Sequence, residues 1–256
     1  MAAVTSVYLL YLFAPIILLV VGSFGESWTN SLLPSGITTN WYAELTGDPS
    51  FQRAFYASLK VVGAVCLINT LITVPLAYAI HSSARAGVGV AARISSLMPI
   101  AAPELVLAFG FILVFSSDAL PWLGSIWLLI AGHVVLTMPY LLNALLADMR
   151  GLALVEIERT AAALGATFRQ RFVDVVLPSL RYSLLSGLIT VSAISIGEFQ
   201  FSNLVAGFLN RTYPILLLQA FYGATGFACA ATVVLLGLAT CAGIASALTA
   251  HAARSG

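Results

Sequence analysis

The sequence predicts an all-α membrane protein with six transmembrane helices. Of its 256 residues, 60% are hydrophobic and only 8% are charged, whereas soluble domains carry about 25% charged residues. A hydrocarbon core about 30 Å thick is crossed by roughly 20 consecutive apolar residues. Six runs of about this length follow one another along the chain, at residues 5–23, 58–80, 94–115, 123–146, 183–208 and 226–248.

Composition also argues against several other classes of protein. The net charge of +1 comes with no basic face that could hold nucleic-acid phosphates, so we expect no nucleic-acid partner. Cys66, Cys229 and Cys241 lie in apolar runs without metal-ligand spacing, and we interpret them as small buried residues rather than a metal site. The first apolar run has no basic residue before it and no small-residue cleavage motif, so we interpret it as an uncleaved span.

The distribution of basic residues predicts the orientation, because cytoplasmic loops are enriched in Lys and Arg. With a cytoplasmic N-terminus, the inner segments hold Arg85, Arg93, Arg150, Arg159, Arg169, Arg171, Arg181 and Arg254, and the outer segments hold Arg53, Lys60 and Arg211. Both termini are therefore predicted to be cytoplasmic. The predicted domains are residues 1–57, a first span with an outer loop; 58–250, the main transmembrane domain, with an inner loop at 148–182; and 251–256, a cytoplasmic tail.

The inner loop is predicted to contain two short helices joined by a tight turn. Residues 154–164 are rich in Ala and Leu, and Gly165 follows as a C-terminal cap. Thr167 and Gln170 have the spacing of a capping box that starts a second helix, and Pro178 is expected to end it. Such a pair of helices could lie on the bilayer surface, or it could fit into a groove on a partner protein.

The loop resembles the cytoplasmic signature of the permeases of type I, binding-protein-dependent ABC importers. That signature is Glu-Ala-Ala, three residues, Gly, nine residues, Ile, one residue and Leu-Pro. The positions that match it are Ala161, Gly165, Val175, Leu177 and Pro178, with Val175 in the place of Ile. Arg159 and Thr160 stand where the family has Glu and Ala, and Glu158 is displaced by one residue, which puts the acidic contact in doubt. His133 with Pro139, and the segment 195–199, are also similar to the family.

The resemblance, which covers residues 58–248, implies a bacterial inner-membrane protein that works with several partners. These are two copies of an ATPase subunit, a second permease that is identical or related, a periplasmic or lipid-anchored substrate-binding protein, and membrane lipid. It also implies that an ATPase cleft receives the loop, and that ATP-driven closure of the ATPase dimer rocks the spans. The predicted ATPase-coupling residues are Glu158, Arg159, Thr160, Ala161, Ala162, Leu164, Gly165, Ala166, Thr167, Leu177 and Pro178.

The residues themselves indicate that ATP hydrolysis belongs to another chain. A phosphate-binding loop needs a Gly-rich turn followed by Lys and Ser or Thr, and the one lysine, Lys60, follows Ser58 and Leu59. We therefore expect no cofactor on this chain, with ATP and Mg²⁺ bound by the partner. The sequence has no His-Glu-x-x-His motif and no Gly-x-Ser-x-Gly motif, so we do not expect an enzyme.

Four polar residues at membrane depth are candidates for the translocation pathway or its gate, because buried charges in membranes are usually functional. They are Glu104, His133, Ser195 and Glu198. Glu104 follows Pro103 and could instead bond the freed backbone of a broken helix. His133 could equally be a structural hydrogen-bonding group between spans, in the same way as Asn69.

An outer segment at residues 208–222 is too polar at its start and too short to span the membrane, and it predicts a short helix at the mouth of the pathway. The candidates for contact with the binding protein are Trp41, Arg211 and Tyr213. The motifs Ser23-Phe24 and Trp41-Tyr42 and the segments 198–203, 211–214 and 219–222 resemble permeases of the polyamine, iron and phosphonate branch. The stretch 198–231 most resembles permeases for 2-aminoethylphosphonate, which makes 2-aminoethylphosphonate the first expected substrate and a polyamine the second. The alternative function is an ion-gradient-driven secondary transporter, although the inner loop would then be unexplained.

Overall fold

The structure is a computed structural model that describes residues 2–28, 33–83, 87, 94, 98 and 101–255. The chain divides into two compact units, and the boundary between them falls inside one long helix after Ser58. Unit 1 comprises Met1–Ser58 and Arg211–Cys241, and unit 2 comprises Leu59–Asn210 and Ala242–Gly256. Some features predicted from the sequence lie outside the described residues. They are Arg85, Arg93 and most of the part of the third predicted span that precedes residue 101.

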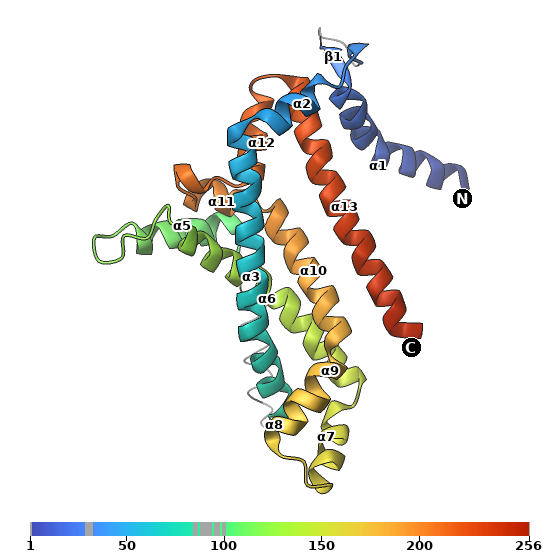
Figure 1. Ribbon diagram of the computed structural model, residues 1–256, viewed down its shortest axis with the longest axis vertical. Coiled ribbons are helices and arrows are strands. Elements are labelled where there is room, and N and C mark those ends of the chain that lie inside the picture. Colours follow the sequence, from blue (N-terminus) through green and yellow to red (C-terminus); the bar gives the residue numbers. More distant parts are fainter. Residues whose placement is uncertain are drawn as a thin grey trace. The chain divides into compact units, whose positions relative to one another are not determined.

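Unit 1 combines apolar helices with a small hairpin (Figure 1). Its elements are α1 (Ala2–Ser23), β1 (Gly25–Ser27), β2 (Ser35–Ile37), α2 (Asn40–Gly47), the start of α3 (Pro49–Ser82), α12 (Tyr213–Phe221) and the first part of α13 (Thr225–Ser255). β1 and β2 pair antiparallel, with Gly25 opposite Ile37.

An aromatic cluster forms the core of unit 1. The ring of Phe51 on α3 lies edge-on to Tyr213 on α12 and to Phe227 on α13, with ring centroids 5.5 and 5.1 Å apart. The N–H of Tyr213 donates to Ser58 Oγ at 2.9 Å, and its hydroxyl donates to the carbonyl of Ala231 at 2.9 Å. The short helix α12 predicted for segment 208–222 is therefore present and is held by both packing and hydrogen bonds.

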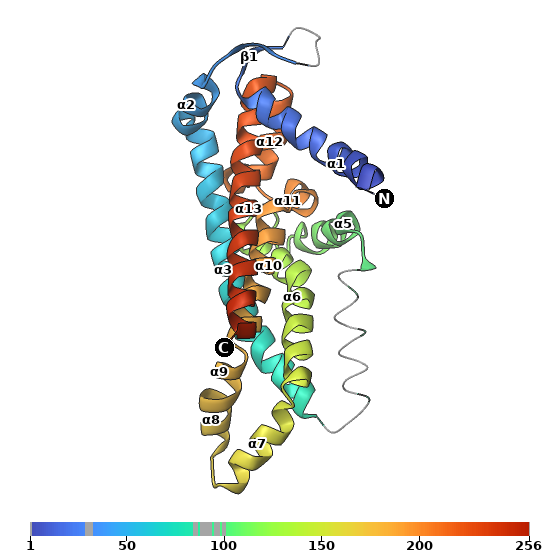
Figure 2. The same ribbon diagram turned by 90° about the vertical axis from the view of Figure 1, so that its right-hand side faces the viewer.

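Unit 2 holds the remaining elements and both candidate sites. They are the rest of α3, α5 (Glu104–Phe115), α6 (Ile126–Gly151), α7 (Leu154–Ala163), α8 (Phe168–Gln170), the π-helix η1 (Arg171–Val176), α9 (Leu177–Ser179), α10 (Arg181–Gly197), α11 (Gln200–Val205), the 3₁₀ turn η2 (Phe208–Asn210) and the end of α13. α10 packs along α6, and the short α11 packs against α5 and α6. Figures 1 and 2 show α7 and α8 together at one end of this unit.

Close packing in unit 2 centres on Phe201, which is fully buried. Its ring lies against α6 at Gly132, where a Cβ atom would collide with the ring, and edge-on to Phe111 of α5. A glycine in the middle of α6 therefore makes room for an aromatic side chain of α11. This packing holds the short α11 in the centre of unit 2.

The helical membrane fold is confirmed, but the count of six spans is not. Among the described residues, three helices are long and apolar enough to cross a membrane, α1 from Val4, α3 and α6. A fourth candidate is the bent pair formed by Phe168–Ser179 and Arg181–Gly197, with an angle of 62° between its parts. Two shorter apolar helices, Glu104–Phe115 and Thr225–Cys241, add to these.

Two of the predicted spans differ from the structure. In the third, the described part is α5, which has only 12 residues and starts at Glu104 directly after Pro103. The fifth, predicted as continuous over 183–208, breaks at Glu198 into α10 and α11. The predicted spans rest on average apolar composition, which passes over Pro103 with Glu104 at the first break and over the polar residues that start at Glu198 at the second.

Candidate functional site

The inner loop folds as the sequence predicts at its turn. Gly165 adopts a left-handed conformation with φ of +88°, which costs little for glycine and allows the chain to leave α7. Thr167 then caps α8 in a complete capping box. The N–H of Thr167 donates to Gln170 Oε1 at 2.8 Å, and the N–H of Gln170 donates to Thr167 Oγ1 at 3.4 Å. The predicted turn between two short helices is therefore confirmed.

Beyond the capping box, the second helix differs from the prediction. It continues from α8 through the π-helix η1 into α9, and it ends at Ser179 rather than at Pro178. Pro178 lies in the first turn of α9. A proline ring clashes with the carbonyl four residues before it in a regular α-helix, and the wider π-turn preceding Pro178 offers room for the ring. Pro178 therefore does not stop this helix.

The tip of the loop is open to solvent. Leu164 is 85% exposed, and next to it is a groove of about 350 Å³ lined by Leu164, Gly165, Ala166, Gln170, Asp174 and Val175. The predicted coupling residues with exposed side chains are Arg159, Thr160, Ala162, Leu164, Thr167 and Pro178, and those that are half-buried are Ala161, Ala166 and Leu177. Most of the predicted set thus lies on an accessible surface.

Glu158 is the exception, because it points into unit 2. It is 8% exposed, and its Oε2 accepts a 2.8 Å hydrogen bond from the hydroxyl of Tyr78 near the end of α3. Nη1 of Arg171, on η1, lies 3.9 Å from the same oxygen. The carboxylate is therefore engaged within the chain, and its part in an acidic contact with the ATPase stays a prediction.

Tyr78 is a residue that the sequence did not single out. Its ring lies against both aromatic residues of the second arm of the loop, with centroids 6.0 Å from Phe168 and 5.2 Å from Phe172. A tyrosine near the end of an apolar run is usually interpreted as an interfacial anchor. Its hydrogen bond to Glu158 joins residues that are 80 positions apart in the chain, so the sequence around Tyr78 does not predict it.

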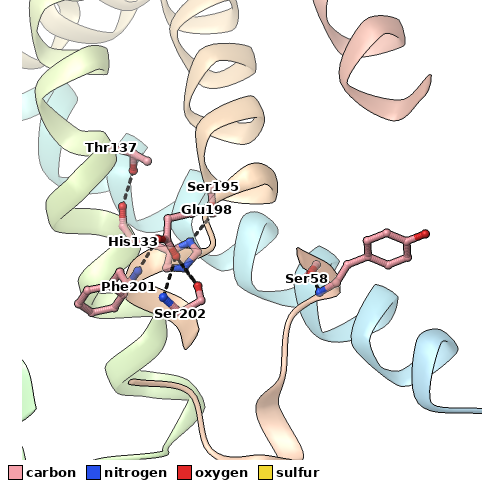
Figure 3. A network of polar contacts seen from close by, with 8 residues as sticks. Ser58, His133, Thr137, Ser195, Glu198, Phe201 and Ser202 are labelled. Carbon is pink, nitrogen blue, oxygen red and sulfur yellow. Dashed lines mark hydrogen bonds and ion pairs between the residues drawn. The ribbon is translucent and has the colours of Figure 1, made fainter. Parts of the chain in front are cut away.

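A second site is a buried polar cluster where α6, α10 and α11 meet (Figure 3). The imidazole of His133 on α6 lies between two serine hydroxyls. Its Nδ1 is 2.8 Å from Oγ of Ser195 on α10, and its Nε2 is 2.9 Å from Oγ of Ser202 on α11. Glu198 completes the cluster, with its Oε2 3.5 Å from His133 Nε2. All four residues are buried.

One arrangement of protons satisfies every hydrogen bond in the cluster. The Ser202 hydroxyl donates to Glu198, so it accepts from His133 Nε2–H. Nδ1 is then the unprotonated nitrogen of a neutral imidazole and accepts from the Ser195 hydroxyl. A chain of hydrogen bonds thus runs from Ser195 through His133 and Ser202 to Glu198.

Glu198 has a second, structural task at the break between α10 and α11. Its two carboxylate oxygens accept the backbone N–H groups of Phe201 and Ser202 at 2.6 and 2.8 Å. The first N–H groups of a helix lack partners within that helix, and at membrane depth they need another acceptor. The carboxylate supplies that acceptor and stabilises the start of α11.

The cluster extends to α3 through Thr137. The hydroxyl of Thr137 donates to the carbonyl of His133 at 2.6 Å and accepts from Nδ2 of Asn69 at 2.8 Å. Asn69 is therefore the link between helices that the sequence predicts. Ser202 and Thr137 were missed, because small hydroxyl residues in apolar runs carry no distinctive signal.

Glu104 lies near this cluster without joining its hydrogen bonds. It begins α5, which packs against α11, and it is half-buried. The structure thus brings together His133, Ser195 and Glu198, with Glu104 beside them. Glu104 is the most accessible carboxylate of the group.

The three candidates for binding-protein contact lie in unit 1 and differ in exposure. Trp41 is half-buried, and its Nε1–H donates to the carbonyl of Gly25 at 2.7 Å. Arg211 is half-buried, with its guanidinium 3.3 Å from Gln219 Oε1. Tyr213 is only 4% exposed, so its side chain is a core residue and is poorly placed for a direct contact. Trp41 and Arg211 stay predictions.

Comparison with known proteins finds that this chain is similar in sequence to permeases of transport systems. The chain is 26% identical over 193 residues to PhnV of Salmonella typhimurium, a permease protein assigned to 2-aminoethylphosphonate transport, with 75% of this chain and 71% of PhnV covered. It is 26% identical over 221 residues to PotI of Escherichia coli, a putrescine transport system permease, with 82% and 75% covered. No family model matches the chain.

A solved structure confirms the fold. A chain of a bacterial ABC transporter that imports the acidic polysaccharide alginate superposes with a TM-score of 0.75, covering 98% of this chain and 92% of that chain at 18% identity. The resemblance to the phosphonate and polyamine branch seen in the sequence is confirmed by PhnV and PotI. This chain therefore has the fold of ABC importer permeases and is similar in sequence to the permeases of phosphonate and polyamine transport systems.

Proposed function

We propose that the chain is the membrane permease subunit of a bacterial ABC importer and that it binds its ATPase through the loop of α7 and α8. The single observation that carries this is the exposed tip. An apolar side chain, Leu164, stands in solvent beside an open groove on a turn fixed by a positive-φ glycine and a capping box. A rigid apolar projection of this kind suits a cleft on a partner protein.

The proposed complex contains two copies of the ATPase, a second permease that is identical or related, and a periplasmic or lipid-anchored binding protein. ATP and Mg²⁺ are bound by the ATPase, and this chain binds neither. Closure of the ATPase dimer moves the loop, and the attached helices move as bodies to alternate access to the pathway. The fold shared with a chain of the alginate importer supports this assignment.

The proposed location is the bacterial inner membrane, with several crossings and both termini in the cytoplasm. The distribution of Lys and Arg supports this orientation, and it puts the tip of the loop in the cytoplasm. In the pathway, we assign Glu104 to contact with the solute, because it is half-buried, and the cluster of His133, Ser195 and Glu198 to the wall or gate beside it.

The proposed substrate is a small charged solute, with 2-aminoethylphosphonate first and putrescine second. The relatives PhnV and PotI support these two candidates. The test uses the complete complex in proteoliposomes together with its binding protein. Stimulation of ATP hydrolysis by 2-aminoethylphosphonate, with none by putrescine at equal concentration, is the expected result, and the reverse would select putrescine.

The docking function is tested by Gly165→Val with Gly151→Ala as its control. A Cβ atom meets nothing within 4 Å at either glycine, but Gly165 alone of the two has a positive φ. The branched valine is strained there, so the turn changes shape while the helices stay folded. We expect Gly165→Val to lose co-purification with the ATPase and solute-stimulated ATP hydrolysis, and Gly151→Ala to keep both.

Assembly and activity in Gly165→Val at the wild-type level would overturn the docking function. The alternative, a secondary transporter, is tested with this chain alone in vesicles. Uphill uptake driven by an ion gradient, without an ATPase, would establish the alternative and exclude the importer.

A further inference from the structure

Tyr78 lies in the last turns of the long helix α3. α3 has 34 residues, which is about 51 Å at 1.5 Å per residue, whereas the hydrocarbon core is about 30 Å thick. With the proposed orientation, the last turns of α3 reach the cytoplasmic side. Tyr78, half-buried in those turns, is thus positioned to meet the inner loop.

Both arms of the inner loop contact this one side chain. The first arm contributes Glu158 of α7, which accepts the 2.8 Å hydrogen bond from the Tyr78 hydroxyl. The second arm contributes Phe168 and Phe172, whose rings lie 6.0 and 5.2 Å from the Tyr78 ring and are stacked on each other with an interplanar angle of 14°. A motion of either arm therefore acts on α3 through Tyr78.

The two arms are also tied to each other at the same point. Nη1 of Arg171 on η1 lies 3.9 Å from the Glu158 oxygen that receives the tyrosine hydrogen bond. α7 packs against η1 and the end of α6, so the loop forms one body around the junction. Glu158 is thereby satisfied inside the chain, which explains why an acidic side chain is 8% exposed on a helix whose neighbouring positions face solvent.

We propose that Tyr78 is the positioning residue that joins the inner loop to α3, so that movement of the loop by the ATPase moves α3 with it. This rests on the proposed function. The hydroxyl holds the first arm and the ring holds the second. Loss of the hydroxyl disconnects one arm while the tip of the loop, and hence ATPase docking, is unchanged.

The test compares Tyr78→Phe with Tyr56→Phe in the complete complex reconstituted with binding protein and solute. Tyr56 lies on the same helix and is 60% exposed, so its hydroxyl serves as the matched control. Three quantities are measured, namely ATPase co-purification, ATP hydrolysis, and solute imported per ATP hydrolysed. We expect Tyr78→Phe to retain the first two and to lose about tenfold in the third, as fits the loss of a hydrogen bond to a charged group. Tyr56→Phe is expected to match the wild type in all three.

A purely structural role for Tyr78 predicts a different result. Accumulation, assembly and transport would then fall together, and the solute imported per ATP would be unchanged. An unchanged ratio in Tyr78→Phe would overturn the proposal even if total transport fell. If instead the wild-type chain fails to assemble with any ATPase, the docking function itself fails, and the two failures are thus distinguishable.

A double-mutant cycle supplies a second criterion, which holds even if Tyr78→Phe accumulates poorly. Glu158→Gln keeps the size of the acceptor but removes its charge, so it is expected to lower the solute imported per ATP several-fold on its own. The double variant is expected to be no worse than Tyr78→Phe, because both changes act on the same hydrogen bond, one by removing its donor and the other by removing the charge of its acceptor. Additive losses, or an unchanged ratio in Glu158→Gln, would overturn the proposal.

Discussion

At the scale of single residues, four buried polar side chains join helices of unit 2 to one another. His133, Ser195, Ser202 and Glu198 form one chain of hydrogen bonds among three helices. Each buried group has a partner, which avoids the cost of leaving a polar group unpaired in an apolar surrounding. These hydrogen bonds explain how the Glu198 carboxyl group is accommodated at membrane depth although no lysine or arginine among the described residues is bonded to it.

Ser202 is predicted to be the most sensitive member of this cluster. Ser202→Ala removes the hydroxyl between His133 Nε2 and Glu198, so it leaves a buried donor unpaired and weakens the cap of α11. We expect a loss of about 1–3 kcal/mol in the free energy of unfolding, measured by thermal unfolding in detergent. Ser186→Ala is the control, because the Ser186 hydroxyl bonds only a carbonyl of its own helix at 3.2 Å. Equal melting temperatures in the two variants would contradict the assigned network.

At the scale of elements, the local signals of the turn predicted its structure, whereas the stop predicted at Pro178 was wrong and contacts between distant segments were not predicted. The turn at Gly165 and the capping box of Thr167 and Gln170 depend on neighbouring residues, so spacing alone predicted them. The break at Glu198 depends on a carboxylate that turns back to cap α11. Neither periodicity nor composition predicts that contact.

The long-range contacts show the same limit for the candidate sites. His133 was a candidate because of its charge and depth, but its partners lie 62 and 69 residues away in the chain. Tyr78 and Glu158 form a hydrogen bond although they are 80 residues apart in the chain. From the sequence, Glu158 was predicted to contact the ATPase, and its contact with α3 was not predicted. Residue type thus identified several site members, and tertiary contacts decided the direction in which each side chain points.

The capping box gives a prediction at this scale. Thr167→Ala removes the hydroxyl that accepts the Gln170 N–H, which costs about 1 kcal/mol. The start of α8 should then open more often, with amide hydrogen exchange over residues 168–172 faster by about fivefold. Thr190→Ala on α10 is the control, since its hydroxyl bonds a carbonyl of its own helix at 3.1 Å. Unchanged exchange over 168–172 would show that the tertiary contacts of the loop, rather than the cap, fix the helix start.

At the scale of the whole molecule, the loop can act in transport only if its movement also moves the helices attached to it. The superposition over 98% of the chain shows that a sequence of 18% identity has kept this fold. The conserved architecture therefore does not depend on particular apolar side chains, many of which face outward and need only be apolar. At the tip of the loop, by contrast, the proposed function needs a particular apolar side chain, because that side chain would be buried in the partner.

Leu164 is the side chain on which that argument is tested. It is 85% exposed, and Leu209 in η2, at 86%, offers a matched leucine away from the loop. Neither leucine contributes much to folding, so Leu164→Ser and Leu209→Ser should both keep the wild-type melting temperature. Burial of a leucine in a partner contributes about 1.5–3 kcal/mol, so Leu164→Ser should weaken binding of the ATPase by tenfold or more, whereas Leu209→Ser should not. Equal affinities in a titration of ATPase against the two variants would place the docking surface elsewhere on the chain.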